Sequence, residues 1–171
     1  FEDLITKKGI YNLSSSHVGS LGGVLALKNE ECHIAPMHIL DDDGSYNINA
    51  IKKYIKKKVY LIKGIKREQG IYVEKGNPKN IKSIKDLTRD DLVFVNRQKG
   101  SGTRILLDNI IKENEIHKKS INGYDREMTT HMMVAQSVLG KTCDCGIGIK
   151  SVAKTMNLDF IPIGYEDYDF A

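Results

Sequence analysis

The stretch Phe94-Val95-Asn96-Arg97-Gln98-Lys99-Gly100-Ser101-Gly102-Thr103-Arg104 joins an apolar strand to a helix through a glycine-flanked loop. The strand is expected at residues 93–96, and the apolar pairs Ile105-Leu106 and Ile110-Ile111 predict a helix over 103–114. A strand that runs through a short loop directly into a helix is the unit from which α/β sheets are built. This stretch therefore decides the fold class, which is α/β.

The same alternation continues on both sides of this stretch. Alternating strands and helices predict a parallel or mixed sheet that is flanked by helices. A length of 171 residues corresponds to one domain, or to two small lobes that share the chain. Further strands are expected at 32–37, 59–65, 69–73, 145–149 and 160–163, and further helices at 21–28, 47–55, 83–87, 129–139 and 151–156.

Composition and charge exclude several classes of protein. With 26 basic and 22 acidic residues the net charge is only +4, and the basic run from Lys52 to Arg67 is expected to be a solvated helix face and strand edge. Because no convincing nucleic-acid-binding motif accompanies this run, no direct nucleic-acid contact is expected. The sequence contains no run of 18 or more apolar residues, so no membrane span is expected.

The three cysteines, Cys32, Cys143 and Cys145, indicate a reducing compartment. Their number is odd, and the Cys-Asp-Cys spacing is awkward for an ordinary disulfide. A structural zinc site would need a second pair of ligands, which the sequence lacks, so no metal is expected. The start, Phe1-Glu2-Asp3-Leu4, has no signal-peptide pattern and reads as the middle of a domain. We therefore expect a fragment of a longer protein, and the cysteines predict a cytoplasmic location.

The loop that ends in Arg104 has the properties of an anion site. The first N–H groups of a helix lack partners within the helix and carry partial positive charge. Glycines allow the backbone to approach a ligand, and Ser101 and Thr103 add hydroxyl groups. Arg97 and Arg104 add positive charge and bidentate geometry. In open α/β sheets, ligands bind beyond the carboxyl ends of the strands, where this loop falls.

The alternative is an ordinary capped turn, in which Ser101 or Thr103 is the N-cap and both arginines are solvated. Spacing alone leaves the two interpretations open. The loop is not a P-loop, because no Gly-Lys-Ser/Thr follows at the required distance. It is not a nucleophile elbow either, since Gly100-Ser101-Gly102 lacks the outer spacing. No catalytic residue is assigned.

A second small-residue loop, Val18-Gly19-Ser20-Leu21-Gly22-Gly23, also leads into a helix. It offers the Ser20 hydroxyl and free N–H groups near Leu21. Oxyanions are often held between two opposed helix N-termini, so two such loops in one chain are more informative than one. His38 follows an expected strand and could donate to an anion, although a hydrogen-bonded loop histidine fits equally well.

Motifs along the whole chain then resemble one known family. The chain is similar to the periplasmic-binding-protein-like domain that is fused behind molybdopterin biosynthesis (molybdotransferase) proteins, and behind helix-turn-helix DNA-binding segments. A more distant similarity is to tungstate-binding proteins of uptake transporters, although Arg104 stands where those proteins have histidine. The motifs lie at 18–23 (VGSLGG), 35–41 (APMHILD), 44–47 (GSYN), 69–70 (QG), 76–78 (GNP), 96–104 (NRQKGSGTR), 123–124 (GY), 130–131 (TH), 146–149 (GIGI) and 158–162 (LDFIP).

This resemblance implies a type II periplasmic-binding-protein-like fold, with two lobes of mixed sheet flanked by helices and joined by crossover strands. The first lobe would hold residues 1–67 with 164–171, and the second would hold 68–163. Related domains extend beyond both ends of this sequence, so the resemblance also implies that the first lobe is truncated.

The resemblance further implies a ligand-binding domain without enzymatic activity or a tightly bound cofactor. Its ligand would be a small oxyanion such as molybdate or tungstate, or a molybdopterin-type group. Partners outside this chain would be a fused molybdotransferase or a helix-turn-helix domain. The expected ligand-binding residues are Ser20, Leu21, His38, Arg97, Ser101, Gly102, Thr103, Arg104 and Thr130.

Two competing functions remain. An accessory domain of a molybdotransferase, acting in metal insertion into molybdopterin, would also bind a pterin phosphate. A sensor domain of a DNA-binding regulator would bind the ligand alone. The residues that precede Phe1 in the full gene product would distinguish them.

Overall fold

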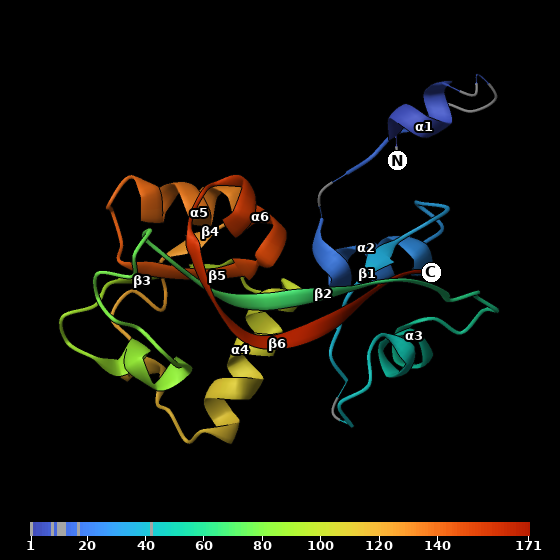
Figure 1. Cartoon of the computed structure of the whole chain (residues 1–171). Coiled ribbons are helices and arrows are strands. Elements are labelled where there is room, and N and C mark those ends of the chain that lie inside the picture. Colours follow the sequence, from blue (N-terminus) through green and yellow to red (C-terminus); the bar gives the residue numbers. More distant parts are fainter. Residues whose placement is uncertain (1, 8, 10–12, 17, 42) are drawn as a thin grey trace.

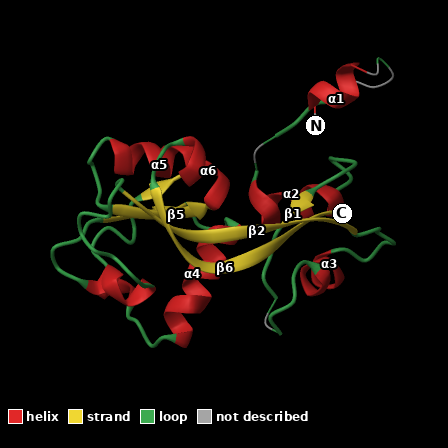
Figure 2. Ribbon diagram, in the orientation of Figure 1, coloured by secondary structure: helices red, strands yellow, loops and turns green. Residues whose placement is uncertain are grey.

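The computed structural model describes residues 2–7, 9, 13–16, 18–41 and 43–171, and one mixed sheet organises them (Figures 1 and 2). Within these residues the strand order is β1-β6-β2-β5-β3-β4. β2 pairs antiparallel with β5 and β6, whereas β3 runs parallel to β4 and β5. The expected α/β class with a mixed sheet is confirmed. The strands are β1 (Pro36–Met37), β2 (Ile62–Val73), β3 (Phe94–Arg97), β4 (Glu127–Met128), β5 (Cys145–Ile149) and β6 (Asp159–Phe170).

Helices gather at the two ends of this sheet. In Figure 1, α4, α5 and α6 surround one end, and α2 and α3 lie at the other. None of the described helices is long and apolar enough to cross a membrane. The helices are α1 (Glu2–Lys7), α2 (Gly19–Lys28), α3 (Ile48–Tyr54), α4 (Gly102–Glu113), α5 (His131–Leu139) and α6 (Lys150–Thr155), with short 3-10 helices η1 (Ile84–Thr88) and η2 (Lys118–Ser120).

The long strands β2 and β6 connect the two ends. The sequence predicted two separate strands at 59–65 and 69–73, and this was wrong because β2 is continuous over twelve residues. The strand expected at 160–163 likewise continues to Phe170. Both errors have one cause: the middle of each strand carries charged residues, which interrupt the apolar pattern although they are paired with each other across the sheet.

The strand expected at 32–37 is also shorter than predicted. Only Pro36 and Met37 form β1, opposite Phe170 and Asp169 of β6. Before them, the Ala35 N–H donates to the Ala171 carbonyl at 2.8 Å, and the Ile34 side chain is 56% exposed. The apolar run therefore reaches the surface instead of extending the sheet.

Side-chain alternation along β2 builds a core on each face of the sheet. Ile71 packs on one face with Leu107 and neighbouring residues of α4. Tyr72 packs on the opposite face with Val134 of α5. A smaller core around Val24 lies at the α2–α3 end. The division into lobes of residues 1–67 with 164–171 and 68–163 stays a prediction.

A β-bulge lies where β2 and β6 pass from one end of the molecule to the other. Gln69 pairs with Gly164, but the next residue, Gly70, pairs with Pro162. Pro162 has no N–H to donate, and a bulge is one of the few places in a sheet that tolerates it. The ladder is therefore irregular next to the buried charged residues described below.

Candidate functional site

The two glycine-rich loops singled out in the sequence lie side by side. Ser101 is the N-cap of α4, and its hydroxyl oxygen accepts the Arg104 N–H at 3.3 Å. Gly19, at the start of α2, has a φ of +73°, and a Cβ there would lie 4.0 Å from the Gly100 carbonyl oxygen. The N-terminal ends of α2 and α4 therefore approach each other, as two loops that hold one anion would require.

His38 connects these two helix ends. Its backbone N–H donates to the Ser20 hydroxyl at 3.2 Å, which ties it to α2. Its ring lies against Gly102 of α4, where any Cβ would overlap the imidazole. The same ring stacks on Tyr168 with 5.5 Å between centroids. His38 is thus enclosed by α2, α4 and β6, and glycine is required at position 102.

Glu166 is the buried acid of this region, with 1% of its surface exposed. Its Oε2 lies 2.7 Å from His38 Nδ1, and its Oε1 forms an ion pair with Arg67, the residue opposite it in the β2–β6 ladder. Burial alone would raise the pKa of Glu166, but the hydrogen bond from His38 and the charges of His38 and Arg67 lower it. Glu166 is therefore ionised and already paired.

Arg97, at the end of β3, is buried without a carboxylate partner among the described residues. Its Nε donates to the Met128 carbonyl at 3.3 Å, and one terminal nitrogen donates to the Thr129 carbonyl at 3.0 Å. Burial lowers the pKa of its guanidinium and outweighs the attraction of Tyr72 and Glu166, which raise it, while the nearby positive charge of Arg67 lowers it further. Backbone carbonyls orient this arginine but do not neutralise it.

Thr103 and His131 are among the polar groups of the region that lack hydrogen-bond partners within the described residues. Thr103, in the first turn of α4, is fully buried with an unpaired hydroxyl. His131, the first residue of α5, has an unpaired Nδ1. Burial, followed by the charges of Arg97, Arg67 and His38, lowers the pKa of His131 to about 2. The imidazole is therefore neutral in an environment that already carries excess positive charge.

We call these residues the central cluster. Its two arginines face a single glutamate, which leaves one positive charge unbalanced. A buried charge without a partner is costly unless a ligand supplies the opposite charge. The central cluster consists of His38, Arg67, Arg97, Thr103, His131 and Glu166.

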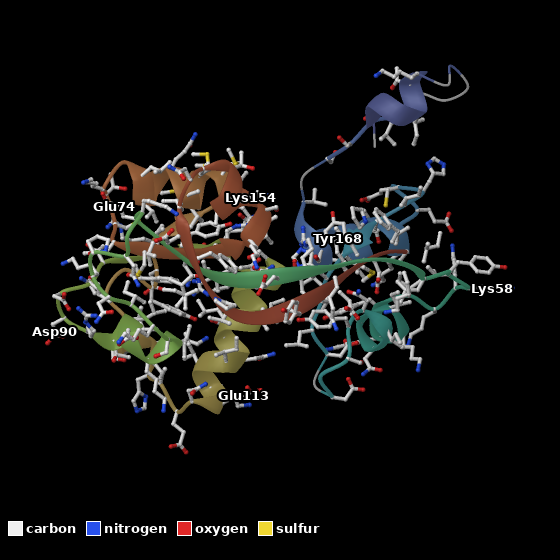
Figure 3. All side chains as sticks on the ribbon, in the orientation of Figure 1. Lys58, Glu74, Asp90, Glu113, Lys154 and Tyr168 are labelled. Carbon is white, nitrogen blue, oxygen red and sulfur yellow. The ribbon has the colours of Figure 1, made fainter. Side chains whose placement is uncertain are left out.

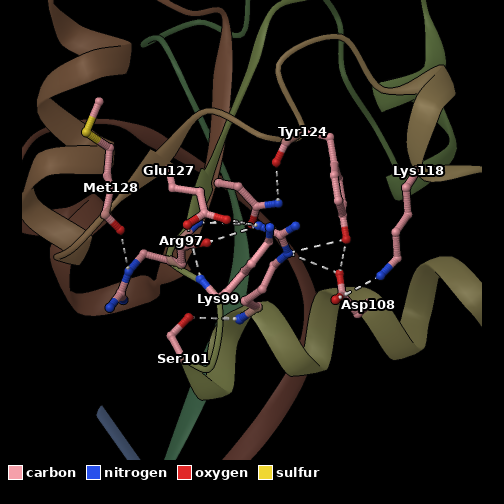
Figure 4. A network of polar contacts seen from close by, with 10 residues as sticks. Arg97, Lys99, Ser101, Asp108, Lys118, Tyr124, Glu127 and Met128 are labelled. Atoms are coloured by element: carbon pink, nitrogen blue, oxygen red, sulfur yellow. Dashed lines mark hydrogen bonds and ion pairs between the residues drawn. The ribbon is translucent and has the colours of Figure 1, made fainter. Parts of the chain in front are cut away.

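Arg104 has different neighbours, and Figure 4 labels three of them, Asp108, Tyr124 and Glu127. Its guanidinium donates to Asp108 and to Glu127, each at 3.2 Å, and lies 4.1 Å from the centroid of the Tyr124 ring. Lys118 also pairs with Asp108, at 3.0 Å. We call Arg104, Asp108, Lys118, Tyr124 and Glu127 the balanced cluster, because two cations face two carboxylates. Arg104 is not a member of the central cluster, and its predicted role in ligand binding stays untested.

The remaining predicted site residues have mixed surroundings. The capping alternative is confirmed for Ser101 but not for Thr103, whose hydroxyl is unpaired. Thr130 caps α5 by accepting the Met133 N–H at 3.1 Å. Leu21 lies half-buried in the first turn of α2. Contact of any of these residues with a ligand stays a prediction.

The sequence analysis missed the contribution of the crossover strands. Arg67 was taken as part of a solvated basic run, and Glu166 was not considered. One signal was available: charged residues in the middle of apolar strands have to be paired if they are buried. The described residues contain no group of three or more His, Cys, Asp or Glu side chains that could hold a metal ion.

Comparison with known proteins places this arrangement in a family. A family model described as the PBP superfamily domain matches residues 2–171. The chain belongs to this family. A curated relative of this PBP superfamily domain is the uncharacterized protein YvgK of Bacillus subtilis (strain 168). It is 37% identical over 153 residues, which cover 88% of this chain and 50% of YvgK. The chain thus spans about half the length of that relative.

Solved structures confirm the type II periplasmic-binding-protein-like fold of this PBP superfamily domain. A substrate-binding protein from Clostridium perfringens, assigned to a phosphate ABC transporter and holding phosphate, has a TM-score of 0.71 at 14% identity, covering 99% of this chain and 77% of that one. The CcmR regulatory domain of Synechocystis PCC6803, in complex with 2-PG, has a TM-score of 0.71 at 13% identity. The match covers 98% of this chain and 76% of the CcmR domain. At these identities the similarity shows the fold alone. The chain is a ligand-binding-type domain, and its neighbours include transport proteins and regulatory domains.

Proposed function

We propose that this domain binds a small oxyanion at the central cluster. The observation that carries the proposal is the buried Arg97, which has no ion-pair partner among the described residues, lies near Arg67 and lowers the pKa of His131. An anion placed there would neutralise the excess charge. It would also provide an acceptor for the Thr103 hydroxyl, which is otherwise an unpaired buried group.

The helix ends strengthen this interpretation. α4 has twelve residues, and Ser101 occupies only one of its free N–H groups, that of Arg104. The N–H groups of Gly102 and Thr103 precede that one and carry the partial positive charge of the helix N-terminus. Arg97 can hold two oxygens of an oxyanion with its planar guanidinium. In this proposal β3 supplies the charge, and α4 supplies the hydroxyl and the N–H donors.

Binding would require the two lobes to separate and close again. His38 and Ser20 belong to the proposed lobe of residues 1–67, whereas Arg97, Gly102 and His131 belong to the lobe of 68–163. The tight contact of His38 with Gly102 corresponds to the closed state. The strands β2 and β6 would act as the hinge, near the bulge at Gln69.

The proposed ligands are molybdate, tungstate or a molybdenum-cofactor-related group, as the resemblance to molybdate- and tungstate-related domains implies. Phosphate is a competitor of the same shape, and it is bound in one of the solved neighbours. A role as the sensor domain of a DNA-binding regulator is favoured by the regulatory domains among these neighbours. In that role ligand binding would shift the equilibrium between open and closed lobes.

Calorimetric titration of the purified chain with molybdate, tungstate, sulfate and phosphate, at fixed ionic strength, tests the proposal. We expect saturable binding of at least one of them, and a loss of about 100-fold in affinity for Arg97→Met. Lys112→Met removes the same charge from an exposed position of α4 and should bind like the wild type. If the folded chain binds none of the four anions, the proposal is wrong.

A further inference from the structure

A groove of about 660 Å³ lies along β2 and α6, and none of the ligand-binding residues predicted from the sequence lines it. Its apolar wall includes Ile65, Ile149, Leu158 and Phe160. Pockets for organic ligands have volumes of roughly 300–1,000 Å³ and are lined mostly by apolar side chains. By size and lining, the groove corresponds to a site for an organic molecule.

The groove carries a strong positive charge. Lys66, Arg67, Lys75, Lys150 and Lys154 line it, whereas Glu68 is its one acidic lining residue among those described. Lys150 pairs with Glu68 at 2.6 Å, and Lys75 pairs with Asp159.

Lys154 has no carboxylate partner within the described part of the chain, and it is labelled on α6 in Figure 3. Lys66 lies 5.9 Å from the centroid of the Tyr165 ring and likewise has no carboxylate partner there. An occupant with at least one negative charge is therefore favoured over a neutral or cationic one.

The groove and the central cluster share one residue, Arg67. It lines the groove, and it forms the ion pair with Glu166. Ile149 also lines the groove, and its carbonyl accepts the Tyr72 hydroxyl at 2.8 Å, beside the pairing of Ile149 with Gln69. A ligand held by Arg67 would therefore border both the cluster and the groove.

The volume exceeds the needs of a bare oxyanion. A tetrahedral oxyanion replaces only a few water molecules, each of which occupies about 30 Å³. The groove has several times that volume, and its apolar wall offers nothing to an inorganic anion. Burial of an apolar body against this wall would add affinity in proportion to the area removed from water.

We propose that the natural ligand is an organic oxyanion. Its phosphate-like group would bind at the central cluster, its apolar or ring-shaped body would lie against Ile149 and Phe160, and a second acidic group would lie near Lys154. This inference rests on the proposed function, because it places the oxyanion group at the same cluster. It differs from that function in requiring a body that occupies the groove.

The test compares three probes by calorimetric titration: inorganic phosphate, phenyl phosphate and 4-carboxyphenyl phosphate. We expect phenyl phosphate to bind at least tenfold more tightly than inorganic phosphate, and the carboxylate to add a further severalfold gain. Ser151→Trp places a large ring on an exposed groove position and should remove the advantage of both organic probes. Lys154→Glu should remove the gain from the carboxylate, whereas Lys112→Glu, an equal charge change on α4, should leave it unchanged.

Three outcomes would overturn the inference. If inorganic phosphate binds as tightly as phenyl phosphate, the groove holds no ligand body, while the proposed function stands. If the organic probes bind more tightly but Ser151→Trp has no effect, the body lies elsewhere. If neither inorganic phosphate nor the organic probes bind, and molybdate, tungstate and sulfate do not bind either, both this inference and the proposed function are wrong.

Discussion

Arg97 and Arg104 flank the same loop, and both are buried, yet their surroundings are opposite. Arg104 donates to two carboxylates and stacks on Tyr124, so its charge is neutralised within the protein. Arg97 donates to two backbone carbonyls and forms no ion pair among the described residues, and the nearby Glu166 is already paired with Arg67. The comparison indicates that the balanced cluster stabilises the fold, and that an anion would neutralise the excess positive charge of the central cluster.

The largest expected effect comes from exchanging the two arginines for methionine, one at a time. Arg104→Met leaves Asp108 and Glu127 without their shared partner, and we expect the free energy of unfolding to fall by about 3 kcal/mol. This value is at the low end for a buried pair because both carboxylates remain partly exposed. Arg97→Met removes two hydrogen bonds, but it also removes an unneutralised buried charge. We therefore expect the free energy of unfolding to fall by only about 1 kcal/mol or less.

Urea denaturation of both variants without any anion measures this difference. Lys112→Met provides the control for loss of a positive charge from an exposed position. Equal destabilisation by the two buried substitutions would contradict the comparison, because it would mean that the Arg97 charge is already balanced in the free protein.

The second effect concerns pH. His131 has a pKa of about 2 in the folded chain against about 6.5 when unfolded, so the unfolded state binds more protons and stability falls as pH drops below 6.5. Between pH 8 and pH 5 the contribution of His131 amounts to about 2 kcal/mol of lost stability. His131→Gln should lose correspondingly less over this range, measured by urea denaturation at each pH.

The two arginine variants sharpen this test. The charge of Arg97 helps to lower the pKa of His131, whereas Arg104 makes no such contribution. Arg97→Met should therefore reduce the pH dependence that His131 causes, and Arg104→Met should leave it unchanged. If Arg104→Met reduces the pH dependence of stability and Arg97→Met does not, the balanced cluster and not Arg97 sets the pKa of His131.

The sequence predicted local structure well and long-range pairing poorly. The loop from Arg97 to Thr103 and the helix after it follow from glycine, hydroxyl and apolar spacing, and the structure confirms them. One pairing was beyond sequence reasoning. Arg67 and Glu166 are paired through a β ladder between distant segments, and no local pattern reveals which charge will face which.

The contrast between Arg97 and Arg104 shows the same limit. Both have the residue type and the place expected of an anion ligand, and the sequence treated them alike. Asp108, one turn after Arg104, was a local sign of an i,i+4 pair. Glu127 and Tyr124, by contrast, reach Arg104 only through the fold. Spacing thus located the loop, but the neighbours that decide the role of each arginine come from other elements.

The smallest effect separates two neighbouring hydroxyls of the same loop. The Thr103 hydroxyl is buried and unpaired, so Thr103→Val should raise the free energy of unfolding by up to about 1 kcal/mol. The Ser101 hydroxyl caps α4, so Ser101→Ala should lower it by about 1 kcal/mol. If Thr103 donates to the oxyanion, Thr103→Val should also weaken anion binding about tenfold, or roughly 1.4 kcal/mol. Higher stability together with weaker anion binding would indicate that the Thr103 hydroxyl serves ligand binding and not folding. Unchanged affinity would exclude Thr103 from the site.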